Sequence, residues 1–148
     1  MRRPRRLVVA VMLLSCLWGV ALARSAASAR SIMNTMIDPS AIRIWRSVST
    51  IVTADGVREV YPRTDKEWKD LRKVASVLAE GGTLLKNEPP PDADEDWDKW
   101  SDAIVDAAAL TIKAVDARNP TRVLEAGEKI YDTCVGCHGG YSLIMAAP

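Results

Sequence analysis

Residues 119–140, NPTRVLEAGEKIYDTCVGCHGG, contain the clearest helical pattern of the chain. Asn119 is a capping residue, and Pro120 is favoured at the first position of a helix. Apolar or small residues then recur at alternating steps of four and three, which places them on one helical face: Val123, Gly127, Ile130, Cys134 and Cys137. We expect this helix to end at Gly139-Gly140 and residues 143–148 to form a loose tail.

Upstream, the same period marks a first helix over about residues 31–54. Its apolar residues share one face: Met33, Ile37, Ala41, Ile44, Val48 and Ile51. Pro39 lies inside this pattern, so the helix either kinks there or begins at Asp38-Pro39. Asp55-Gly56 is expected to end it.

The second and third helices are separated by a run of prolines. Thr64 and Glu67 form a capping box that starts the second helix, and Gly81-Gly82 within it indicates a close approach between helices. Residues 86–94, KNEPPPDAD, predict an extended linker. A third helix follows over about residues 95–118. Four amphipathic helices predict an all-α protein, an up-down-up-down four-helix bundle, with no strand expected.

The composition suits one domain of this class. The chain has 148 residues, of which 48% are hydrophobic and 5% aromatic, with no Phe. Its apolar content is therefore mostly aliphatic, which favours packed helices over a β-sandwich. Three cysteines cannot form a disulfide framework. The formal charge of +1 leaves no large basic surface, so we expect no nucleic-acid partner.

The N-terminus is typical of a secretory signal peptide. Residues 1–7 carry four arginines, and residues 7–23 carry no charge. Cleavage after Ala23 leaves 16 basic and 19 acidic residues, a net charge of −3; cleavage after Ala29 is the alternative. Two other interpretations stay open. The uncharged stretch of 17 residues is close to a membrane span, and Cys16 is a candidate for lipidation; either would attach the protein to a membrane.

The segment Cys134-Val135-Gly136-Cys137-His138 combines two cysteines with the chain's one histidine. Cys-x-x-Cys-His is the attachment signature of c-type haem. Cysteines three residues apart on a helix share a face, so both sulfurs can bond to the two vinyl groups on one haem edge. The adjacent histidine then binds iron from the proximal side. We therefore expect one covalent haem c, attached through Cys134 and Cys137 and ligated by His138.

Three other uses of this motif are weaker. A structural zinc site needs four ligands, whereas this cluster offers three. A thioredoxin-type cysteine pair begins a helix, where the helix N-terminus lowers the thiol pKa, but this pair lies at a helix end. A disulfide is compatible with export but leaves His138 unexplained.

The leader, the four helices and the C-terminal motif together resemble class II cytochromes c, the cytochrome c′ and cytochrome c-556 group. The resemblance covers about residues 31–141, including the stretch IMNTMIDP at 32–39, Ile44-Trp45 and the segment 138–141. It implies a four-helix cytochrome domain over residues 31–142 with its haem attached near the C-terminus. Family members often carry a lysine inside the haem motif, where this chain has Val135-Gly136.

The resemblance leaves the sixth iron ligand open. Cytochromes c′ leave that position empty and bind small gases, whereas the c-556 type fills it with methionine from the first helix and carries electrons. In an up-down-up-down bundle the start of the first helix lies beside the end of the fourth, so Met33 and Met36 both begin near the haem. Met33, on the inner face, is the first choice; Met36 is the runner-up and Met145 the third.

Other candidate haem contacts are aromatic or basic. Four tryptophans are candidates to pack on the porphyrin and three arginines to pair with its propionates, although core packing and solvation are commoner for such residues: Trp45, Trp68, Trp97 and Trp100, and Arg30, Arg43 and Arg46.

We expect a periplasmic electron carrier that transfers single electrons between redox partner proteins. No nucleophile is paired with a base, so we do not expect an enzyme. The first alternative is a high-spin haem protein, similar to cytochrome c′, that binds NO or CO. The second is a haem-free metal or redox-dithiol module. Pairing of two bundles as a homodimer stays open.

Overall fold

The computed structural model describes residues 29–90 and 93–145, with side chains up to Tyr141. The expected signal peptide, its cleavage after Ala23 and the lipidation of Cys16 fall outside these residues. Over the part of the chain that is described, no helix combines the length and the apolar character that a membrane crossing requires.

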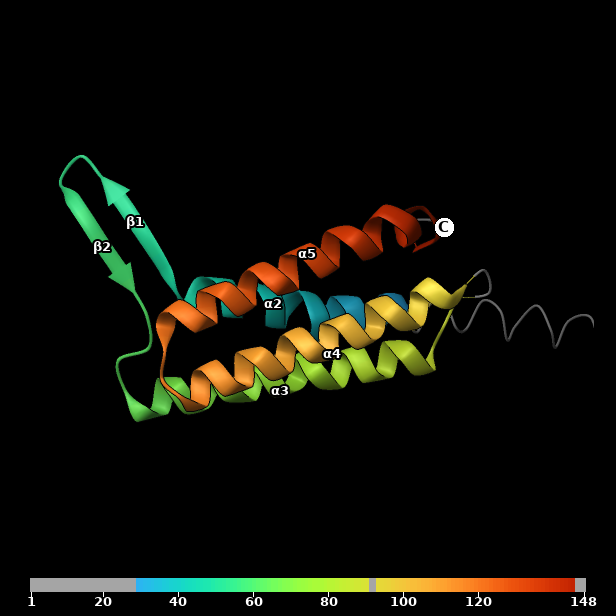
Figure 1. Ribbon diagram of the computed structural model, residues 1–148, viewed down its shortest axis with the longest axis horizontal. Coiled ribbons are helices and arrows are strands. Elements are labelled where there is room, and N and C mark those ends of the chain that lie inside the picture. Colours follow the sequence, from blue (N-terminus) through green and yellow to red (C-terminus); the bar gives the residue numbers. More distant parts are fainter. Residues whose placement is uncertain (1–28, 91–92, 146–148) are drawn as a thin grey trace, which may run out of the picture.

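Four helices pack up and down, as expected from the sequence (Figure 1). The first is continuous from residue 29 to residue 47 and consists of a helical turn at 29–32, the π-helix η1 (Met33–Ile37) and α2 (Asp38–Ser47). The others are α3 (Asp65–Asn87), α4 (Glu95–Asp116) and α5 (Pro120–Met145). The start of the first helix and the end of α5 lie at the same end of the bundle.

The expected starts of the second, third and fourth helices are confirmed. Thr64 caps α3 by accepting a hydrogen bond from the Glu67 amide at 3.2 Å, and the Glu67 carboxylate accepts one from the Thr64 amide at 2.8 Å. Asp94 caps α4 by accepting from the Asp96 amide at 3.0 Å. Pro120 is the first residue of α5. Side chains that bond these exposed amides define where each helix begins.

The expectations that the first helix reaches Ala54 and that the chain forms no strand are wrong. The helix ends at Ser47, and a hairpin follows, formed by β1 (Ser49–Thr53) and β2 (Gly56–Val60) in antiparallel register. Four of the five β1 residues are β-branched, which favours extended backbone. Gly56 has a φ of 133°, a conformation that suits glycine, so Asp55-Gly56 is a hairpin turn.

The hairpin projects from the bundle at the end opposite the C-terminus of α5 (Figure 1). Its strands are exposed on both faces, with Val52 74% and Val57 67% exposed. The register pairs these two valines directly. The hairpin therefore adds little to the core.

The expected end of the last helix at Gly139-Gly140 is also wrong. Helix α5 continues through both glycines to Met145, so the predicted tail at 143–148 is helical through residue 145. Tyr141, directly after the glycines, is buried, and its hydroxyl donates a hydrogen bond to Asp94. This tertiary contact holds the last turns against the low helix propensity of glycine.

Gly81 and Gly82 bring helices together, as expected. A Cβ on Gly81 would lie 2.8 Å from Ile37 Cδ1, and a Cβ on Gly82 would lie 2.9 Å from Ile104 Cγ2. Their absence of side chains lets α3 pack closely on η1 at one position and on α4 at the next.

Candidate functional site

The Cys134–His138 motif lies in the later part of α5, at the end of the bundle where the first helix begins. Cys137 is buried, Cys134 is half-buried and His138 is exposed. Val135 points outward and is 54% exposed. Because the two cysteines are three residues apart, their side chains share the inner face of the helix.

A small cavity joins this motif to the other helices. It is lined by residues from all four of them: Met33, Ile37, Asp38, Leu85, Trp97, Trp100, Ser101, Ile104, Thr133, Cys134, Cys137 and His138. Half of these side chains are apolar or aromatic, and two of the others are cysteines. Met33, Cys134, Cys137 and His138 therefore all border one cavity, although His138 is exposed on its outer side.

The structure separates the two methionine candidates. Met33 is buried and lines the cavity with the cysteines. Met36 is half-buried and turns towards α3, where its Cβ lies 3.3 Å from the position that a Cβ on Gly81 would take. The side chain of Met145 lies outside the described residues. Of the two described methionines, Met33 is the one that faces the motif.

The cavity is much smaller than a haem pocket. Its volume of about 20 Å³ is enough for one water molecule, whereas pockets for large ligands measure about 300 Å³ or more. The donor set thus fits a c-type haem, but the lining must separate to admit the ring.

Trp100 is the lining side chain that lies directly against the motif. A Cβ on Gly136 would lie between 2.2 and 2.7 Å from three carbons of the Trp100 ring. The indole therefore lies directly on the motif backbone, in room left by the absent side chain. Trp100 is half-buried, so it can swing towards solvent at lower cost than the buried Trp97.

Helix packing also leaves room for separation at this end. Segment η1 packs against α3, whereas α5 packs mainly against α4 and, further from the motif, against α2. The contact between α2 and α5 includes a hydrogen bond of 2.9 Å from Trp45 Nε1 to the Gly127 carbonyl. Met33 lies on the first helix and the motif on α5. These two helices contact each other mainly near Trp45 and Gly127, and they pack less tightly beside the motif.

Burial keeps both thiols protonated at neutral pH. Burial raises the pKa of Cys134, and the negative charge of Asp38 raises it further. Burial also raises the pKa of Cys137 to about 11, with an added contribution from Cys134. Both cysteines are free. Redox-active dithiols have lowered pKa values, so these values weigh against the dithiol alternative.

The zinc alternative also lacks support. Within residues 29–90 and 93–141, no three His, Cys, Asp or Glu side chains are grouped so that they could hold a metal ion. Cys134, Cys137 and His138 therefore do not converge on one point, although the two thiols share a face.

Tyr141 and Asp94 form a contact at this end that sequence reasoning missed. The Tyr141 hydroxyl donates to Asp94 Oδ1, which also caps α4 through the Asp96 amide. The Tyr141 ring packs edge-on against Trp97 at a centroid distance of 5.2 Å. No local signal pairs residues 47 positions apart, so only the packing of α5 on α4 shows it.

Two of the other candidate haem contacts lie beside the motif. Of the four tryptophans named above, Trp97 and Trp100 line the cavity, whereas Trp45 packs against Tyr131 and Trp68 lines a different hollow. Arg43 and Arg46 lie beside α3 near Asp70. Neither is among the residues that line the cavity, and neither is Arg30.

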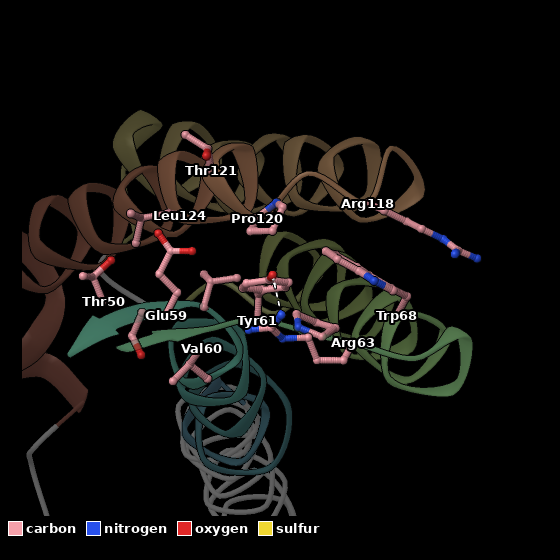
Figure 2. A pocket seen from close by; sticks show the side chains of 13 residues that line it. Thr50, Glu59, Val60, Tyr61, Arg63, Trp68, Arg118, Pro120, Thr121 and Leu124 are labelled. Carbon is pink, nitrogen blue, oxygen red and sulfur yellow. Dashed lines mark hydrogen bonds between the residues drawn. The ribbon is translucent and has the colours of Figure 1, made fainter. Parts of the chain in front are cut away.

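A larger hollow of about 530 Å³ lies at the opposite end, between the base of the hairpin and α5 (Figure 2). Arg63 donates to the Tyr61 hydroxyl and lies 3.6 Å above the Tyr61 ring centre. Arg118 points away from the other labelled side chains and pairs with Asp65 at 2.7 Å. Both arginines already have protein partners, and no cysteine or histidine lies there.

Comparisons with models of known protein families, with curated proteins and with solved structures find no match to this chain.

Proposed function

We propose that this protein is an exported c-type cytochrome that carries one covalent haem and transfers single electrons between redox partners in the periplasm. The supporting observation is that Met33 lines the same cavity as Cys134, Cys137 and His138, although about a hundred residues separate them. Core packing alone could be satisfied at position 33 by any apolar side chain of similar size, so it does not account for a methionine beside this motif. The resemblance to class II cytochromes c supports the same assignment.

Each residue has a separate role in this proposal. Cys134 and Cys137 would hold the group on α5 through thioether bonds. His138 would ligate its iron, and Met33 is the second residue that would do so. When bound, haem c supplies a one-electron iron couple, and methionine–histidine ligation raises its potential.

The surroundings of the motif support electron exchange with another protein. Leu85, Trp97 and Ile104 make the inner wall apolar and are buried, so they exclude water from the iron side of the site. Outside, Val135 and His138 are exposed on α5. An edge of the site near the surface shortens the path for an electron to a docked partner, while the apolar wall limits solvent rearrangement.

The test is to export the protein in a host that matures c-type cytochromes and to record oxidised and reduced spectra, with and without CO. A low-spin spectrum that resists CO, with a methionine–iron charge-transfer band, is expected. Cys134→Ser with Cys137→Ser should abolish covalent attachment, and His138→Ala should abolish the native spectrum. Val135→Ala, at an exposed position of the same motif, is the matched control and should leave the spectrum unchanged.

Each other outcome selects another function. A high-spin spectrum that shifts with CO would assign the protein to NO or CO binding and return Met33 to the core. A colourless protein with titratable thiols or bound metal would contradict the cytochrome assignment and support the haem-free metal or redox-dithiol module.

A further inference from the structure

The first helix changes its hydrogen-bond register just before Pro39. Residues 29–32 and α2 are α-helical, but η1 between them is a π-helix. The Asp38 amide donates to the Met33 carbonyl, five residues back instead of four. A π-turn is rare and accommodates one extra residue in an otherwise regular helix.

This widened turn aligns the buried residues of the first helix. Ala29, Met33, Ile37 and Ala41 are spaced by four and are 0%, 9%, 1% and 2% exposed. In a regular α-helix each step of four residues turns about 40° beyond a full circle, so these positions would drift by about 120°. The π-turn holds more residues per turn and offsets this drift. Met33 therefore stays in line with Ile37 and faces the cavity.

Pro39 gives a physical reason for the position of the turn. Proline has no amide hydrogen, and its ring clashes with the carbonyl four residues earlier, which here belongs to Thr35. Widening the turn directly before Pro39 moves this carbonyl away from the ring. An alanine at position 39 would restore the missing donor and permit regular α-helical geometry.

Gly81 of α3 accommodates the widened turn from the other side. A Cβ there would lie 2.8 Å from Ile37 Cδ1 and 3.3 Å from Met36 Cβ. The Ile37 side chain and the Met36 Cβ thus use space that a side chain at position 81 would fill.

We propose that Pro39 is a positioning residue for Met33: by holding residues 33–37 in the π-turn, it directs the Met33 sulfur into the cavity as the sixth iron ligand. Return to regular α-helix would turn the segment before residue 38 by roughly the angle of one residue, about 100°. The Met33 side chain would then move around the inner face of the helix, out of line with Ile37 and Ala41 and away from the cavity position that it now lines. This inference rests on the proposed cytochrome function.

The experiment compares three variants of the haem-loaded protein with wild type. Pro39→Ala and Met33→Leu should both retain covalent haem, bind CO in the reduced form, lose the methionine–iron band and have lower reduction potentials. Pro120→Ala is the matched control, because it removes a proline from the first position of α5. At that position no carbonyl of the same helix lies four residues earlier. It should behave as wild type.

A crystal structure of Pro39→Ala provides a readout that is independent of redox behaviour. The Asp38 amide should donate to the Asn34 carbonyl instead of the Met33 carbonyl. The inference is overturned if Pro39→Ala keeps both the hydrogen bond from the Asp38 amide to the Met33 carbonyl and the resistance to CO. It is also overturned, with covalent haem attachment intact, if wild type itself binds CO readily. A wild-type protein without covalent haem would overturn the proposed function as well.

Discussion

Gly136 illustrates how one missing side chain shapes the site. It occupies the second variable position of the Cys-x-x-Cys-His motif, and the Trp100 ring lies where its Cβ would be. The sequence places Gly136 in a helix, where glycine costs about 1 kcal/mol relative to alanine. This cost is offset by the close packing of the Trp100 ring on Gly136. Only the tertiary structure shows that contact, because Trp100 belongs to α4.

Gly136→Ala should displace Trp100 and destabilise the protein despite the better helix propensity of alanine. Forcing extra atoms into a packed contact costs typically about 1–3 kcal/mol, which exceeds the gain of about 1 kcal/mol. Urea unfolding of the two proteins measures the difference in their free energies of unfolding. Gly139→Ala is the control, because a Cβ there meets nothing within 4 Å, and it should be neutral or stabilising. Equal effects at both positions would contradict the proposed steric role of Gly136.

At the scale of elements, the end of α5 depends on α4. The Tyr141 hydroxyl donates to Asp94, and this bond lowers the pKa of the Asp94 carboxyl, while burial and then Asp94 raise the pKa of Tyr141 to about 12. The ionised carboxylate and the neutral phenol are therefore the forms that the fold stabilises.

Tyr141→Phe should lower the denaturation midpoint at neutral pH, because it removes this bond while the ring still packs on Trp97. For Asp94, whose folded pKa is lowered, the contribution is present above its ordinary value of 3.8 and is lost as pH falls through the folded value. For Tyr141, whose folded pKa is raised, it is present below 10 and is lost as pH approaches about 12. The difference between wild type and variant should therefore shrink at both extremes.

Chemical denaturation across this pH range measures the effect. Tyr131→Phe is the control, because Tyr131 is 60% exposed and lies on the same helix. A difference of the same size at pH 2 and at pH 7 would exclude the Asp94 bond as its source.

The hairpin is an element that periodicity misassigned. Val48 and Ile51 continue the apolar spacing of the first helix, but β-branched residues and Asp55-Gly56 follow the same stretch. Short apolar runs fit both periods, and the choice depends on what they pack against. Val48 is still buried, but the strand residues after Ser49 are largely exposed, so local β preference prevails there.

Over the whole molecule, Trp97 connects three helices at the end of the bundle that holds the Cys134–His138 motif. Its ring is 2% exposed, its Nε1 donates to the Leu85 carbonyl of α3 at 2.8 Å, and Tyr141 of α5 packs against it. It also lines the cavity beside the motif. Loss of this side chain affects the site and the bundle together.

Trp97→Ala should destabilise the fold by about 3–5 kcal/mol, as large-to-small changes of buried aromatics do. Trp97→Phe keeps most of the ring but leaves the Leu85 carbonyl without its partner, at a cost of about 1–3 kcal/mol. Trp45→Phe is the control, since it also removes an indole hydrogen bond but at a side chain that is 37% exposed. It should cost less. Thermal unfolding measures the loss of stability in the three variants. An equal loss for Trp97→Phe and Trp45→Phe would contradict the claim that burial makes the Trp97 hydrogen bond more costly to remove.

The sequence by itself determined the four helical segments and the Cys134–His138 motif, because period, caps and motif spacing are local properties of the chain. It placed the starts of α3, α4 and α5 for the same reason. Only the tertiary structure decided that the first helix ends at Ser47, that α5 continues past Gly139-Gly140, and that Met33 and not Met36 faces the cysteines. These three features depend on contacts between distant segments, whose energies are absent from any local pattern.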